Sequence, residues 1–276
     1  MVRILTDSTC DLTKDRMDAL GILCVPLTVQ IGAQTYTDGV TLSNHAFYEK
    51  LRTEKDFPKT AQPSPQAFLD IFSMHAAQGE EIVCLLISSE LSGTVQSARI
   101  AASELEDAKI YILDSRTACL SLGLLVEIAA KWAHEGLSGA AIYEKLESLT
   151  ERIRIIAAVE TLEYLKKGGR LSAAAATIGT MLNLHPIVGI LDGKVVSFTK
   201  VRGKKKMLET LYKQAQADGN DTTYPILLGH GDAKANYEAL CALFASVDTE
   251  KRYGEIGSVI GAHAGPGVTA VAYIKK

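Results

Sequence analysis

One polar stretch of the chain, SSELSGTVQSAR at residues 88–99, contains residue types that could bind an anion. It follows the apolar run 82–87, which is typical of a buried strand, and Ser92 or Gly93 is expected to open an amphipathic helix. The first amides of a helix have no partner within it, and with the positive end of the helix dipole they favour a carboxylate or phosphate. Ser is also a preferred helix cap, so this stretch alone favours a capping role for Ser92.

Other polar side chains are expected near Ser92, because they follow neighbouring strands or precede a rigid turn. Thr60 stands just before a turn that Pro63 and Pro65 stiffen. In a parallel sheet the carboxyl ends of the strands share one rim, where ligands bind. This placement makes anion binding by Ser92 as well supported as capping. The polar residues expected at the rim are Asp7, Ser8, Thr60, Ser88, Ser92, Asp114 and Ser115.

The second half of the chain adds His263, in GAHAGPG at residues 261–267. The three glycines and Pro266 predict a turn in which backbone amides approach a ligand, with one imidazole in reach. Such turns are common, and a lone His is more often structural. Arg170, in GGR at 168–170, is also ambiguous: it could clamp an anion, although capping of the preceding helix's carbonyls is the favoured interpretation.

Basic residues gather in KVRGKKKM at residues 200–207. Cations at a helix N-terminus are unfavourable to the helix dipole, so this cluster needs a reason to be there. An acidic or phosphate-bearing partner would supply one, and a solvated helix start is an equally good interpretation.

The elements that must position these residues alternate between strand and helix as far as about residue 152. This order predicts a parallel sheet with helices on both faces. From residue 153 the pattern changes, because Asp192-Gly193 is a two-residue hairpin signal and further strands are expected around Val259 and Val268. We expect an α/β protein with two domains, residues 1–152 and 153–276. The strands expected in the first domain include 2–5, 22–31, 82–87 and 109–113.

Composition excludes several classes of protein. The net charge of -3 and the pI near 6.1 argue against a dedicated nucleic-acid binder. No apolar run reaches the length of about 18 residues that a membrane span needs, and the N-terminus has no features of a targeting peptide. The five scattered cysteines fit a reducing compartment, and no CxxC or HExxH pair indicates a zinc site.

Seven short motifs occur in order along the chain: TDSTCDL at 6–12, TAQPSP at 60–65, SSELSGTVQSA at 88–98, LDSRTA at 113–118, LEYLKKGGRLS at 162–172, KVR at 200–202 and GAHAGPG at 261–267. In this order they resemble the DegV family of bacterial fatty-acid-binding proteins, from residue 2 to about residue 273. The resemblance implies an N-terminal α/β/α domain with a mainly parallel sheet and a C-terminal α/β domain with a mixed sheet. It also implies a fatty acid held between the two domains.

The same resemblance implies which residues hold the carboxyl group of the fatty acid. Hydroxyl groups and one backbone amide are its ligands, with an imidazole and a guanidinium close by. The implied residues are Thr60, Ser92, the amide of Gly93, His263 and Arg170.

Two positions depart from the family pattern. Ala61 replaces the serine of the usual TSQPSP, and Gly203 replaces the usual threonine after KVR, which leaves docking of a kinase in doubt. The acyl chain is expected to contact apolar side chains of a helix rich in small residues. The expected lining consists of Ile178, Met181, Leu182 and Leu184. The expected docking residues for a partner are Arg202 and Lys204.

The resemblance further implies that the chain is a lipid-binding protein and no enzyme by itself. Family members that serve fatty acid kinase present the carboxyl group to a separate ATP-dependent kinase subunit, and an acyl phosphate results. We expect a cytoplasmic monomer with a bound long-chain fatty acid, no cofactor, no metal and no nucleic-acid partner. Contact with a membrane is expected to be transient, without stable insertion.

A serine hydrolase is the alternative from another functional class. Ser92 would be the nucleophile, His263 the base, and Asp7 or Asp114 the group that orients the base. Ser92 lacks the G-x-S-x-G elbow of the α/β-hydrolases, however, and a binding role also explains Thr60 and Gly93.

Overall fold

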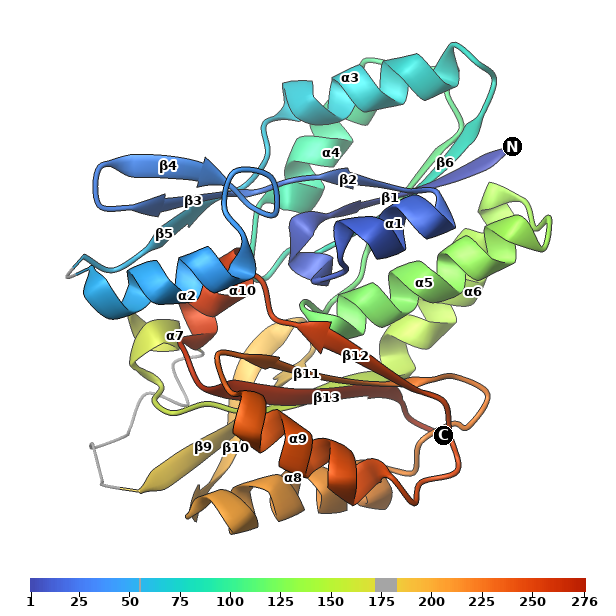
Figure 1. The fold of residues 1–276 in the computed structure, drawn as a ribbon. Helices are drawn as coiled ribbons and strands as arrows, with labels where there is room; N and C mark the ends of the chain where they lie inside the picture. Colours follow the sequence, from blue (N-terminus) through green and yellow to red (C-terminus); the bar gives the residue numbers. More distant parts are fainter. Residues whose placement is uncertain (55, 172–182) are drawn as a thin grey trace.

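The structure, a computed structural model, describes residues 1–54, 56–171 and 183–276. These residues form stacked layers of helix, sheet, helix, sheet and helix, with a small third sheet to one side (Figure 1). The α/β class and the pairing of a parallel sheet with a mixed sheet confirm the prediction from the sequence.

The first large sheet has four parallel strands in the order β2-β1-β6-β7. Its central strand β6 comes from the apolar run, and Val83, Cys84 and Leu85 are fully buried because helices cover both faces. The strands are β1 (Val2–Asp7), β2 (Ile22–Val25), β6 (Glu81–Leu86) and β7 (Ile110–Asp114). The helical elements beside them are η1 (Ser8–Cys10), α1 (Lys14–Leu20), α3 (Pro65–Ala76), α4 (Thr94–Ala102), α5 (Leu120–His134) and α6 (Gly139–Arg152).

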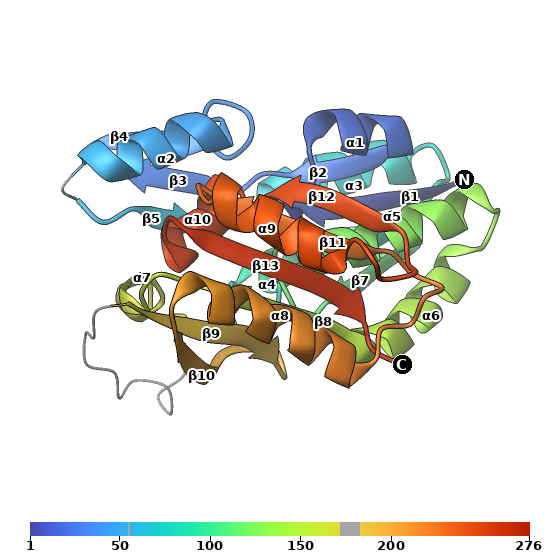
Figure 2. The same cartoon turned by 60° about the horizontal axis from the view of Figure 1, so that its bottom comes forward.

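The second large sheet is mixed and has the strand order β10-β9-β8-β13-β11-β12. The predicted hairpin is confirmed: Asp192 and Gly193 both have positive φ, 49° and 80°, as a two-residue turn with a right-handed twist requires. Figure 2 shows α8 (Lys204–Asp218) and α9 (Lys234–Phe244) over one face of this sheet. The strands are β8 (Ile153–Ala158), β9 (Leu184–Leu191), β10 (Lys194–Arg202), β11 (Ile226–Gly231), β12 (Lys251–Glu255) and β13 (Val268–Ile274).

A small antiparallel sheet, in the order β4-β3-β5, corrects one prediction. The single strand expected over residues 22–31 is divided at Pro26 into β2 and β3, which belong to different sheets. Proline has no N–H for a strand ladder, so the chain leaves the first sheet there. The elements of this region are β3 (Thr28–Ile31), β4 (Gln34–Thr37), β5 (Lys59–Ala61) and the helix α2 (Asn44–Thr53).

The strand expected around Val259 was also predicted wrongly. Residues Ser258–Ala264 form the helix α10, and its N-cap and C-cap residues are Gly257 and Gly265. Val259 and Ala262 of α10 pack in a cluster whose other buried members, including Phe47 and Tyr48, come from the first half of the chain. Tertiary packing therefore overrides the strand preference of this β-branched sequence. The preceding short helix α7 (Glu163–Lys167) lies against α10.

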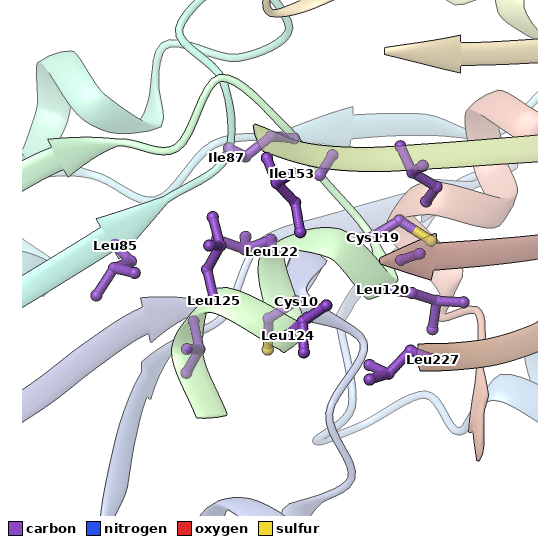
Figure 3. Packing of buried hydrophobic residues seen from close by; sticks show 14 of the residues in the cluster. Cys10, Leu85, Ile87, Cys119, Leu120, Leu122, Leu124, Leu125, Ile153 and Leu227 are labelled. Atoms are coloured by element: carbon purple, nitrogen blue, oxygen red, sulfur yellow. The ribbon is translucent and has the colours of Figure 1, made fainter. Parts of the chain in front are cut away.

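Helix α5 joins the two large sheets into one core. Leu120, Leu122 and Leu124 of α5 are in the same buried cluster as Leu85 of the first sheet and Leu227 of the second. Figure 3 shows Leu120 of α5 near Leu227 of the second sheet, and Leu124 beside Cys10 of η1. A helix with leucine on more than one face is buried all round, which explains the central place of α5. The division into domains at residue 152 stays a prediction, because the core continues across it.

In the ranges given above, no helix is both long enough and apolar enough to cross a membrane. Over the same residues, no cluster of three or more His, Cys, Asp or Glu side chains has an arrangement that could hold a metal ion.

Candidate ligand-binding site

A cavity of about 340 Å³ is lined by residues from both halves of the chain, and its volume falls within the usual range for ligand pockets. Most of its wall is apolar, with Ile87 from the first half and Ile155, Val188 and Val268 from the second sheet. The polar side chains on the wall are few. Among the described residues they are Thr60, Gln62, Ser92, Arg170 and His263.

Thr60 and His263 meet across this cavity. Thr60 lies on β5, opposite Val29 of β3, and His263 lies in the last turn of α10. The Oγ1 atom of Thr60 is 2.8 Å from the Nε2 atom of His263. Two residues that are 203 positions apart in the sequence therefore form one hydrogen-bonded pair.

The imidazole of His263 is neutral near pH 7. Burial, and next the positive charge of Arg170, lowers the pKa of His263 from 6.5 to about 4. Its Nδ1 atom is buried without a hydrogen-bond partner in the described part of the chain. The direction of the bond to Thr60 depends on the tautomer of His263. We assign the proton to Nε2, because this tautomer leaves no ring N–H buried without an acceptor. The hydroxyl hydrogen of Thr60 is then free to be donated to a bound anion.

Gly168 has to be glycine because His263 lies against it. A β-carbon at this position would lie 2.2 Å from the Nδ1 atom of His263, closer than any real contact. The GGR segment therefore has a packing role that the sequence did not reveal.

Ser92 and Gly93 stand at the start of α4, as expected. The N-cap residue is Gly93, and no side chain caps this helix. The hydroxyl of Ser92 bonds instead to the Oγ1 atom of Thr94, at 2.8 Å, and Ser92 lines the cavity. The capping interpretation of Ser92 is therefore wrong, and the residue belongs to the wall of the cavity.

Gln62 is a site residue that the sequence reasoning missed. Its Nε2 atom donates to the carbonyl of Gly93, at 3.2 Å, and to the Oγ atom of Ser97, at 3.0 Å. A β-carbon on residue 93 would lie 2.1 Å from the Oε1 atom of Gln62, so this contact requires a glycine. The available signal was its place in TAQPSP, two residues after Thr60.

Arg170 both caps a helix and faces the site. Its Nη1 atom donates to the carbonyl of Gly168 at the end of α7, at 2.6 Å, as the capping interpretation requires. Its Nε atom donates to the carbonyl of Leu91, at 3.0 Å, which connects it to the loop that carries Ser92. Because Arg170 also lines the cavity, its fixed positive charge favours an anion there.

Comparison with known proteins identifies the family of this chain. The family model for DegV matches residues 1–276. The chain belongs to the DegV family. A DegV domain-containing protein of Deinococcus radiodurans is 36% identical over 276 residues, which cover 98% of this chain and 97% of the relative.

Solved DegV structures have the same fold. A DegV family protein from Thermus thermophilus, described by its fatty acid binding, has a TM-score of 0.90 and 33% identity, with 99% of each chain covered. A stearic acid-binding protein from Eubacterium ventriosum has a TM-score of 0.90 and 29% identity, covering 100% of this chain and 99% of that one. The DegV prediction from the seven motifs is confirmed.

The geometry of this DegV site does not assemble the hydrolase triad. The Nε2 atom of His263 bonds to Thr60, whereas the hydroxyl of Ser92 bonds to Thr94. The carboxylate of Asp7 accepts from the amides of Thr9 and Ile87 and from the hydroxyl of Thr9.

Asp114 is likewise engaged away from His263. It accepts from Ser89 and from the amide of Arg116. Neither carboxylate orients the imidazole, and the hydrolase interpretation has no support from these contacts.

The predicted acyl-chain lining stays a prediction for three of its four residues. Ile178, Met181 and Leu182 lie outside the described residues. Leu184 is the first residue of β9 and pairs with Arg202 of β10. It is not among the described residues that line the cavity. Much of the described apolar lining comes from strands of the second sheet, along which successive side chains point to opposite faces. These residues include Ile155, Ala157, Val188, Ile190, Val195, Val268 and Ala270.

The basic stretch 200–207 forms a surface of its own. Arg202 ends β10, and Lys204 begins α8. Both line a shallow depression with Lys205, Lys206 and Lys213. Gly203 between them has a φ of 83°, a conformation that favours glycine.

Proposed function

We propose that this DegV protein binds a long-chain fatty acid in the cavity between its two large sheets. The main support is that this apolar cavity contains one group of converging polar side chains, including the Thr60–His263 pair. That arrangement suits a ligand with a single polar end. The proposal is supported by the Thermus and Eubacterium proteins, which are both described as binding a fatty acid.

The donors of the site suit a carboxylate. A buried carboxylate without partners costs several kcal/mol, and each hydrogen bond to a charged group contributes roughly 1.5 to 3 kcal/mol. The ligand's two oxygens accept from the hydroxyls of Thr60 and Ser92 and from the amide of Gly93. Arg170 supplies the positive charge, and His263 holds the hydroxyl of Thr60 in its donating orientation.

The acyl chain supplies most of the affinity. A tail of about 16 carbons, at roughly 0.8 kcal/mol per buried CH₂, contributes on the order of 12 kcal/mol before ordering costs. The polar group at the carboxyl end then sets orientation and selects acids over other lipids.

The bound acid is presented to a separate kinase subunit. One carboxylate oxygen attacks the γ-phosphorus of ATP held by that subunit, ADP leaves, and an acyl phosphate remains on this chain. The basic surface at Arg202 and Lys204 docks the kinase, because an acidic partner would offset the positive charges that gather at this helix N-terminus. The reaction places the protein in the cytoplasm, where ATP is available.

Calorimetric titration of delipidated protein with a long-chain fatty acid and with the matching fatty alcohol tests the proposal. The acid should bind more tightly than the alcohol, and Ser92→Ala should weaken acid binding about 10- to 150-fold. Ser103→Ala, at the other end of α4, is the matched control and should have no effect. Equal affinity for acid and alcohol, or no binding of either, would contradict the proposal.

A further inference from the structure

The helix that carries His263 is too short to hold its own position. Helix α10 has seven residues, and no side chain of its own caps its first turn. Helices of this length are not stable in isolation. Groups from elsewhere in the chain must therefore fix α10, and with it the distance between His263 and Thr60.

Two buried carboxyl groups from the first half of the chain do this. The Oδ1 atom of Asp11 accepts from the amide of Gly257, at 2.9 Å, and the Oδ1 atom of Asp38 accepts from the hydroxyl of Ser258, at 2.5 Å. The amide of Gly257 is one of the backbone groups that a helix start leaves without an internal partner, and the hydroxyl of Ser258 ties the first residue of α10 to Asp38. Asp11 is 9% exposed and Asp38 is 5% exposed.

The packing of Gly257 shows how closely the two carboxyl groups converge. A β-carbon on this residue would lie 2.8 Å from the Oδ1 atom of Asp11 and 3.8 Å from the Oδ1 atom of Asp38. Its φ of −72° is open to any residue, so only this contact demands glycine. The buried hydroxyl of Tyr48 donates to the carbonyl of Ile256, at 3.1 Å, one residue earlier.

We propose that Asp11 and Asp38 are positioning residues of the binding site, because they cap α10 from the other half of the chain and so fix His263 against Thr60. Neither residue lines the cavity. Val259, Ile260 and Ala264 of the same helix do line it, so the two carboxyl groups act on the acyl chain only through α10. This inference rests on the proposed function, since it assigns the two residues to the recognition of a carboxyl group.

The ionisation of His263 tests the inference without any ligand. Because the chain has only six histidines, ¹⁵N-histidine labelling resolves the ring of His263, which His263→Gln identifies. In the delipidated wild type its pKa should be about 4. Asp38→Ala should raise this pKa toward the ordinary 6.5, because the ring loses its fixed buried position. Asp38→Asn keeps an acceptor oxygen for Ser258 and should restore most of the wild-type value.

Binding supplies the second readout. Asp38→Ala and Gly257→Ala should each weaken binding of a long-chain fatty acid about tenfold, while the fatty alcohol loses less. Glu81→Gln is the matched control, because Glu81 accepts from the amide of Gly139 at the start of α6, at 2.7 Å, away from the site. It should leave both the pKa of His263 and the binding unchanged.

The outcomes separate the two proposals. An unchanged pKa of His263 in Asp38→Ala and in Gly257→Ala would overturn the positioning role. If Asp38→Ala fails to fold, Ser258→Ala removes one donor of the same contact and must still raise the pKa. A wild-type protein that binds no fatty acid would refute the proposed function, while the pKa of His263 would still report whether the carboxyl groups hold α10.

Discussion

Replacing Thr60 with valine tests the chemistry of the site at a single atom, because valine keeps the branched shape and removes the hydroxyl. Two interactions are lost. In the bound state the carboxylate loses one donor, which costs roughly 1.5 to 3 kcal/mol of binding free energy. In both states the Nε2–H of His263 loses its acceptor, which lowers the free energy of unfolding by about 1 to 3 kcal/mol but cancels from the binding difference.

Thr60→Val should therefore bind a long-chain fatty acid about 10- to 150-fold more weakly than the wild type in calorimetric titration. Binding of the fatty alcohol should change less, because a neutral hydrogen bond is weaker. Thr35→Val, an exposed position in the same three-stranded sheet, is the control and should bind normally. If Thr60→Val retains acid affinity within about threefold, the hydroxyl is no ligand of the carboxylate and the reasoning fails.

Three further predictions concern His263, Gly93 and the basic surface. Because the folded pKa of His263 lies below 6.5, its contribution to stability is present above pH 6.5 and is lost as the pH falls toward 4. Urea titration at pH 7 and at pH 5 should show that the wild type loses up to about 2 kcal/mol more free energy of unfolding than His263→Gln. Equal losses in the two proteins would contradict a buried neutral imidazole. Gly93→Ala displaces Gln62 and should weaken fatty acid binding severalfold, with the fold retained in circular dichroism; normal binding would remove Gln62 from the site. Arg202→Glu with Lys204→Glu should spare fatty acid binding yet abolish phosphorylation by the kinase, whereas Lys14→Glu on α1 should affect neither; preserved phosphorylation would exclude docking at this surface.

The sequence predicted those parts of the site that depend on local pattern. The apolar run before Ser92 predicted a buried strand, and Gly93 lies at the helix start that the polar stretch indicated. The DegV motifs placed Thr60, Ser92, Arg170 and His263 in one site, and the cavity brings these four residues together.

The parts that the sequence did not predict depend on contacts between distant segments. Helix α10 was expected to be a strand, because its β-branched residues favour one and the carboxyl groups of Asp11 and Asp38 that cap it lie more than 200 positions away. Likewise, the residues of β8, β9 and β13 that line the cavity have the pattern of ordinary core. Whether these residues face a cavity or ordinary core depends on how the first large sheet packs opposite the second, which the local sequence does not show.

The most direct test of the account is to identify what the protein carries when it is purified from cells. Denaturing extraction followed by mass spectrometry should release a long-chain fatty acid at close to one equivalent per chain. The Thr60→Val and Ser92→Ala double variant, purified in parallel, should release much less. An empty wild-type protein, or one that releases a nucleotide instead, would contradict fatty acid binding in this cavity.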